Sequence, residues 1–289
     1  MNLFEKYMNY VRKELISYKL GYTVKENDTD IKIITRLFNA KQRYIPKQKY
    51  IIKESQEIKE SFKRLNKQYQ EAFNEIKMMF SNAEEVRPYL STRIKKTDYY
   101  DKLLLDWNIH HLHLNKKNSV TDYWVDRSDY LLLFIIEANT VYFVDIEKHK
   151  ENNIFEQQKY LKVIYNNWSN ILEPYKKNCE IASYTELTDS GIKKLREAGI
   201  NTPFIIDNKA YMGFGDGISG AGTNFLHQGK AMRIKKYLTR IDEYCKLNEQ
   251  KICHKIYQET NIKLETLTLD LFYDNDELRV IETKSNCLI

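Results

Sequence analysis

The spacing of apolar side chains predicts helices in the first ninety residues. Apolar residues recur every three or four positions over residues 1–20, which places them on one face of a helix. A shorter helix is expected to begin after Asp28 or Asp30. The clearest stripe is formed by Ile58, Phe62, Leu65, Tyr69, Phe73, Ile76 and Phe80. Charged residues occupy the opposite face of that stripe, so we expect residues 1–90 to form a helical N-terminal region.

After Pro88 the pattern changes to short apolar runs and alternating segments, which are typical of strands. Strands are expected at residues 109–114, 129–137 and 140–146. The dipeptide Ala138-Asn139 separates the last two closely enough for an antiparallel hairpin. A helix over residues 151–172 follows. Residues 91–173 are therefore predicted to form an α+β region around a small antiparallel sheet.

The C-terminal part, residues 174–289, is predicted to contain two hairpins around a basic helix. The expected elements are a helix from Asp189 or Ser190, a hairpin over 203–212, a glycine-rich loop over 213–222, a helix over 228–247 and a hairpin over 264–283. Strands and helices do not alternate in the way that a doubly wound parallel sheet requires. We therefore assign the whole chain to the α+β class.

Composition favours a cytoplasmic protein with a polyanionic partner. The 289 residues are 42% hydrophobic, and no apolar run approaches the ~18 residues that cross a bilayer, so no membrane partner is expected. The first fifteen residues mix charged and apolar side chains, unlike a signal peptide. Lys and Arg total 46 against 40 Asp and Glu, a mild bias towards nucleic acid. The four cysteines form no CxxC pair, so neither a zinc finger nor a disulfide framework is expected.

The densest chemical signal is the run Ile109-His110-His111-Leu112-His113-Leu114, which holds half of the six histidines. In a strand, His111 and His113 share one face, while His110 lies on the other face with the leucines. Two imidazoles about 7 Å apart on one face can act on a phosphate or bind a metal. Histidine suits proton transfer because its unperturbed pKa is ~6.5. Histidines with a purely structural role are the alternative.

Residues 93–150 resemble the second half of the RelE/HigB-type toxin fold. Those toxins carry a His-x-Leu segment, a loop, an arginine before Asp-Tyr, an apolar strand, a turn, and a second strand that ends near a histidine. The corresponding residues here are Arg127, Asp129, Tyr130, Tyr142 and His149. The resemblance implies RNA cleavage without a metal or another cofactor, by activating the ribose 2′-hydroxyl and stabilising a pentavalent phosphate. The chain departs from the pattern at Leu131, where the family carries a second arginine.

The same segment is similar to a part of long bacterial abortive-infection proteins, which act in phage defence. They carry an aspartate shortly before a His-x-His-Leu sequence, and Asp106 stands four residues before His110 here. A second hypothesis keeps the histidines but makes them metal ligands. In that metal-dependent nuclease, Asp106 or Asp145 would join His111 and His113.

A glycine-rich loop and the helix after it form the second chemical signal. Three glycines of the loop, Gly215, Gly217 and Gly220, have the spacing of a dinucleotide-binding fingerprint, but the βαβ context of that fingerprint is missing. The Gly-Lys-Ser/Thr sequence of a P-loop is missing as well. Their backbone N–H groups can instead hold a phosphate of a nucleic acid. On the helix, the basic residues Lys230, Arg233 and Arg240 are interleaved with tyrosines at helical spacing, which favours contacts to phosphates and bases. A structural loop and an ordinary charged helix face are the alternatives.

These features together predict a bacterial endoribonuclease of the toxin-like or phage-defence type, with no cofactor. His111 and His113 would supply acid and base, and Arg127 and His149 would contact the scissile phosphate. RNA is the expected partner, and a cognate inhibitor or a phage component would be a further one. The alternatives are the metal-dependent nuclease and a non-catalytic nucleic-acid-binding or sensor protein.

Overall fold

The computed structural model describes residues 2–18, 25, 27–116, 123–150, 153–178, 187–274 and 277–289. The chain divides into two compact units. The terminal unit combines Met1–Phe38 with His227–Ile289, and the central unit comprises Asn39–Leu226. This division differs from the predicted boundaries near residues 90 and 173, because the two ends of the chain share one hydrophobic core. Spacing along the sequence does not show which distant segments share a core.

The middle of the central unit is a mixed sheet, in which the described strands are arranged in the order β1-β4-β3-β2. The strands are β1 (Ile51–Glu54), β2 (His110–His113), β3 (Tyr130–Glu137) and β4 (Thr140–Lys148). β2, β3 and β4 pair antiparallel, as predicted, and Ala138 with a φ of 52° forms the hairpin turn. β1 was not predicted as a strand, and it pairs in parallel with β4 at the edge of the sheet.

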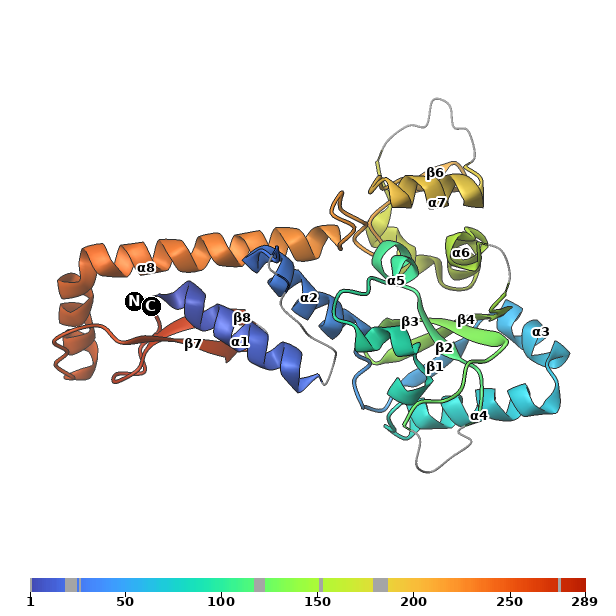
Figure 1. Cartoon of the computed structure of the whole chain (residues 1–289), viewed down its shortest axis with the longest axis horizontal. Coiled ribbons are helices and arrows are strands. Elements are labelled where there is room, and N and C mark those ends of the chain that lie inside the picture. Colours follow the sequence, from blue (N-terminus) through green and yellow to red (C-terminus); the bar gives the residue numbers. More distant parts are fainter. Residues whose placement is uncertain are drawn as a thin grey trace. The chain divides into compact units, whose positions relative to one another are not determined.

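Helices α3 (Gln56–Arg64) and α4 (Lys67–Ser81) cover one face of this sheet (Figure 1). The sequence predicted one continuous helix here. Instead the chain leaves helical geometry at Leu65, where ψ is 147°, and the side chain of Asn66 caps α4 by accepting a backbone N–H. On α4, Phe73 and Phe80 both pack edge-on against Phe143 of β4. The predicted apolar stripe therefore does face the core, although two helices carry it.

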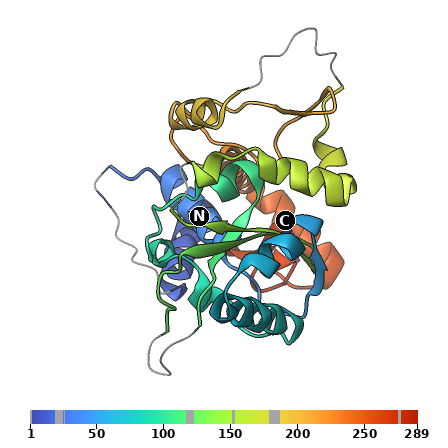
Figure 2. The same cartoon turned by 90° about the vertical axis from the view of Figure 1, so that its right-hand side faces the viewer.

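The opposite face of the sheet is covered by α5 (Lys102–Trp107), the 3-10 turn η3 (Ile154–Glu156) and α6 (Lys159–Leu172), and α7 (Asp189–Glu197) joins the same core (Figures 1 and 2). The helix predicted over 151–172 begins only at Lys159 and is kinked at Trp168. The predicted hairpin of β5 (Phe204–Ile206) and β6 (Lys209–Tyr211) packs on this core through Phe204 and Tyr211. Short 3-10 turns, η1 (Arg87–Tyr89), η2 (Thr92–Lys95) and η4 (Glu173–Tyr175), lie in the connections.

In the terminal unit, α1 (Leu3–Ser17) and the start of α2 (Asp30–Arg43) share a core with α8 (Phe225–Thr260) and the hairpin of β7 (Leu269–Asp274) and β8 (Glu277–Glu282). α8 is longer than predicted and is kinked at Asn248, where φ is −118°. Its buried residues include Ala231, Leu238 and Cys245, which form a buried stripe along one face of the helix. Among the described residues, no helix is both long and apolar enough to span a membrane. The observed class is α+β, as predicted.

Candidate active site

Strand β2 presents histidines to both faces of the sheet, as the alternation predicted. His110 stacks on Phe134 with ring centroids 5.3 Å apart, on the face that α3 and α4 cover. Burial lowers the pKa of His110 to about 4. His111 and His113 lie on the opposite face, where the ring of His111 contacts Phe155 of η3. His110 is therefore a structural residue. His111 and His113 are the histidines of β2 that belong to the candidate site.

His113 packs against His149, which directly follows β4. The two imidazoles stack with centroids 5.5 Å apart and ring planes 25° apart. β3 lies between β2 and β4 in the sheet. The end of β4 is tied to the start of β3, because the backbone N–H of His149 donates to the carbonyl oxygen of Asp129 at 2.7 Å. We call His113 and His149 the stacked pair; His113 is buried, and His149 is half-buried.

The segment before β3 contains Arg127 and contacts His113 of the stacked pair through the next residue, Ser128. The backbone N–H of Ser128 donates to Nδ1 of His113 at 3.4 Å, and its hydroxyl donates to the carbonyl oxygen of Leu114. These bonds hold the exposed Arg127 next to β2. They also leave Nδ1 of His113 as an acceptor, so the neutral imidazole carries its proton on Nε2.

The positive charges around the stacked pair favour the binding of an anion. Burial, followed by the charges of His111, His149 and Arg127, lowers the pKa of His113 to about 4. Burial and the charges of Arg127, His111 and Arg93 also lower the pKa of His149, while Asp129 acts in the opposite direction. Both imidazoles are therefore neutral at pH 7. A bound phosphate would offset the neighbouring cations and raise both pKa values.

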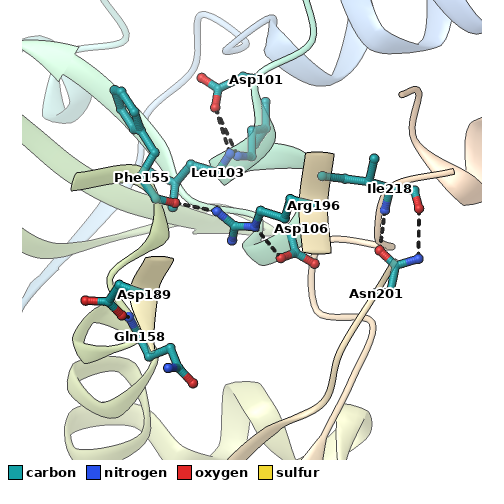
Figure 3. A network of polar contacts seen from close by, with 10 residues as sticks. Asp101, Leu103, Asp106, Phe155, Gln158, Asp189, Arg196, Asn201 and Ile218 are labelled. Carbon is teal, nitrogen blue, oxygen red and sulfur yellow. Dashed lines mark hydrogen bonds and ion pairs between the residues drawn. The ribbon is translucent and has the colours of Figure 1, made fainter. Parts of the chain in front are cut away.

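Sequence reasoning missed Asp101, which lies next to His111. Its Oδ2 is 3.3 Å from Nδ1 of His111. Its Oδ1 caps α5 by accepting the N–H groups of Leu103 and Leu104 (Figure 3). The sequence does contain a signal, because an aspartate directly before a run of helix-forming residues is a typical N-cap. It contains none for the proximity of Asp101 and His111, which results from the packing of α5 on the sheet.

The structure does not bring together the alternative metal ligands. Asp106 is paired with Arg196 of α7, whose Nε lies 2.7 Å from Oδ2 (Figure 3). The Arg196 guanidinium also stacks on Trp107 with 4.1 Å to the ring centroid. Asp145 of β4 accepts a hydrogen bond from Ser61 of α3, and β3 separates its strand from β2. Within the described ranges, no group of three His, Cys, Asp or Glu side chains has an arrangement that could hold a metal ion.

The glycine-rich loop packs against α5 instead of leaving its N–H groups free. The N–H groups of Gly215 and Gly217 donate to the carbonyl oxygens of Asp106 and Leu105 at 3.0 and 3.1 Å. A Cβ on Gly215 would lie 2.4 Å from the backbone of Asp106, whereas a Cβ on Gly220 would meet nothing within 4 Å. Two of the three predicted phosphate donors are therefore used inside the protein. This corrects the predicted role of Gly215 and Gly217, because the close approach to the backbone of α5 accounts for Gly215, and a φ of 80° beside the Asn201 side chain accounts for Gly217.

The basic side chains of α8 form an exposed stripe, as the sequence pattern indicated. Lys230, Arg233 and Arg240 are all exposed, and the interleaved Tyr237 and Tyr244 are 40% and 56% exposed. This stripe belongs to the terminal unit, whereas the stacked pair belongs to the central unit. Its composition fits contacts to phosphates and bases.

The arrangement around the stacked pair can exchange protons and bind an anion. His113 and His149 supply two imidazoles, and the guanidinium of Arg127 supplies a positive charge that acts on both rings. In comparisons with known proteins, no protein-family model, curated protein or solved structure matches the chain.

Proposed function

We propose that the central unit is a metal-independent endoribonuclease of the toxin-like or phage-defence type, which acts on RNA in the bacterial cytoplasm. The observation that carries this proposal is the stacked pair of His113 and His149 beside Arg127. Imidazoles can both accept and donate protons near neutral pH, and a guanidinium binds phosphate. A cognate inhibitor or a phage component would then regulate the enzyme.

In the proposed reaction, His149 takes the proton of a ribose 2′-hydroxyl, and the 2′-oxygen attacks the adjacent phosphorus. The bond between phosphorus and the 5′-oxygen breaks, and His113 gives the leaving oxygen a proton. The products are a 2′,3′-cyclic phosphate and a 5′-hydroxyl. Arg127 pairs with the phosphate oxygens while negative charge builds up on them.

The roles follow from the surroundings of each imidazole. His149 is half-buried, so a substrate hydroxyl can reach it, and it acts as the base. A bound phosphate raises the pKa of His113, so the ring takes up a second proton on Nδ1 and the contact from the Ser128 N–H to that nitrogen opens. The imidazolium then gives its Nε2 proton to the leaving oxygen. This assignment moves the base from His111, which the sequence suggested, to His149. His111 is 7% exposed and lies against Asp101 and Phe155.

The direct test is cleavage of a mixed-sequence RNA by the purified full chain in the presence of EDTA. His113→Asn should slow cleavage by about 10²- to 10⁴-fold, since that is the usual cost of losing an acid or base. Asparagine keeps an oxygen near the position of Nδ1, so the bond from Ser128 can persist. The matched control is His110→Asn, which replaces a buried histidine of the same strand on the opposite face and should leave the rate within about threefold of wild type.

Each alternative gives a different result in the same assay. Loss of cleavage in EDTA with recovery on adding manganese or zinc would support the metal-dependent nuclease. RNA binding without any cleavage would support a non-catalytic binder, which the exposed stripe on α8 favours. Equal activity of wild type and His113→Asn would remove the stacked pair from the mechanism.

A further inference from the structure

Asp101 uses its two carboxylate oxygens for two different contacts. Oδ1 accepts the backbone N–H groups of Leu103 and Leu104 at 3.0 and 3.2 Å, which fixes the carboxylate at the N-terminus of α5 (Figure 3). Oδ2 is thereby held 3.3 Å from Nδ1 of His111. The side chains of His111 and Asp101 are only 8% and 13% exposed, so water screens this contact weakly.

Nδ1 of His111 depends on Asp101 for a partner. The two atoms are within ion-pair distance but outside hydrogen-bond geometry, and Nδ1 bonds to none of the residues that the structure describes. A buried N–H group without a partner costs free energy. A proton on Nδ1 can be shared with Asp101 after a small adjustment of the ring, which identifies Asp101 as its acceptor.

Arg43 of α2 provides a buried positive charge close to Asp101. It is 4% exposed, and its Nη2 makes no hydrogen bond within the described part of the chain. Arg43, Asp101, His110 and His111 line the same small cavity of about 20 Å³. Burial lowers the pKa of Arg43 to about 10, while the charge of Asp101 acts to raise it. Arg43 therefore remains charged at pH 7.

We propose that Asp101 is a positioning residue that keeps a proton on Nδ1 of His111 and thereby fixes the tautomer and the orientation of that ring beside the stacked pair. Among the residues that the structure describes, the titratable or charged groups near His111 include Asp101 before α5, Arg43 on α2, His110 and His113 on β2, and His149 after β4. A positive charge on His111 would lower the pKa of both His113 and His149, so both rings of the stacked pair lie within electrostatic range of His111. The effect of the His111 tautomer on catalysis rests on the proposed function. The contact between Asp101 and His111 does not depend on that function.

The test is the variant Asp101→Asn, because asparagine keeps the N-cap of α5 and removes the carboxylate that faces His111. Its side-chain oxygen can still accept the N–H groups of α5, which turns the amide nitrogen towards Nδ1. That nitrogen is a donor, so the proton of His111 should move from Nδ1 to Nε2. Imidazole ¹⁵N chemical shifts at pH 7.5 distinguish the two tautomers. We expect Nδ1–H in the wild type and Nε2–H in Asp101→Asn.

The matched control is Asp106→Asn, which removes a carboxylate from the same helix that is paired with Arg196 and does not face His111. It should leave the tautomer of His111 unchanged. A wild-type His111 with its proton on Nε2 would overturn the proposal even if Asp101→Asn failed to fold. An unchanged tautomer in a folded Asp101→Asn would overturn it as well.

RNA cleavage by Asp101→Asn separates this proposal from the proposed function. A rate more than about 10-fold below wild type, together with the tautomer change, supports both, since a wrong tautomer is costly in histidine catalysis. If the tautomer changes but the wild type cleaves no RNA, Asp101 keeps its positioning role and the endoribonuclease proposal fails. If cleavage is present and the tautomer does not change, the positioning role fails alone.

Discussion

His113 on β2 and His149 at the end of β4 stack with ring centroids 5.5 Å apart, although β3 lies between their strands. Burial lowers the pKa of both imidazoles, and the charge of Arg127 lowers each further. Arg127→Gln removes the charge and leaves the burial, so both pKa values should rise. An NMR titration of the two imidazoles measures this change. Arg127→Lys is the control, and it should keep both values near those of the wild type.

Acid should destabilise the central unit through its buried histidines. The pKa of both His110 and His113 is about 4 in the folded protein, while the unfolded value is ~6.5. Between these two pH values the unfolded chain binds more protons, so stability falls as the pH is lowered from 6.5 to 4. Each residue can contribute up to about 3 kcal/mol over this window.

Urea unfolding at several pH values between 7 and 4 measures the effect. His110→Asn removes one of the two groups, so its stability should change less over this range than that of the wild type. Parallel curves for wild type and variant would show that His110 binds its proton equally well in the folded and unfolded states.

A methyl group at Gly215 should destabilise the protein, whereas a methyl group at Gly220 should not. Gly215→Ala places a Cβ 2.4 Å from the backbone of Asp106, so the loop or α5 has to move. We expect a loss of about 1–3 kcal/mol, the usual cost of overpacking, measured by thermal unfolding. Gly220→Ala is the matched control, because its Cβ meets nothing within 4 Å. Equal stability of the two variants would contradict the packing role of Gly215.

The exposed stripe of α8 can be tested by its salt dependence. Replacing Lys230, Arg233 and Arg240 with Gln keeps helix propensity and leaves the buried stripe intact. If these side chains pair with RNA phosphates, the slope of log K against log salt should decrease by roughly 0.7 for each lost contact. A control triple variant on the same helix, with Gln at the exposed Lys246, Lys251 and Lys255, changes the net charge equally. Identical slopes for the two variants would show that the basic side chains of the stripe face solvent and do not pair with RNA phosphates.

Local sequence patterns predicted the parts of the fold that depend on neighbouring residues. The alternation in β2 placed His111 and His113 on one face, and Ala138-Asn139 predicted the β3–β4 hairpin correctly. The strand β1 was missed because it has only four residues and its partner β4 lies about 90 positions further along the chain. The break at Leu65 was missed because the apolar period continues through it, although Asn66 provides a capping signal.

In the candidate site too, local sequence patterns identified single residues but not the contacts between distant segments. His113, His149 and Arg127 were selected from the sequence, but the contact between His149 and His113 depends on the sheet order and could not be derived from spacing. Gly215 was assigned to phosphate because its approach to α5 has no local signature. Asp101 was missed for the same reason, since only tertiary packing brings it to His111.

The central claim is that the stacked pair cleaves RNA through the ribose 2′-hydroxyl. The most direct measurement is mass spectrometry of the products from an RNA that the protein cuts at one site, incubated in EDTA beside the same RNA with a single 2′-deoxyribose before the scissile phosphate. We predict a 2′,3′-cyclic phosphate and a 5′-hydroxyl from the all-ribose strand, and no cut at the modified position. Cleavage of the modified strand at that site, or a 5′-phosphate on the product, would contradict the claim, because neither can arise from attack by the 2′-oxygen.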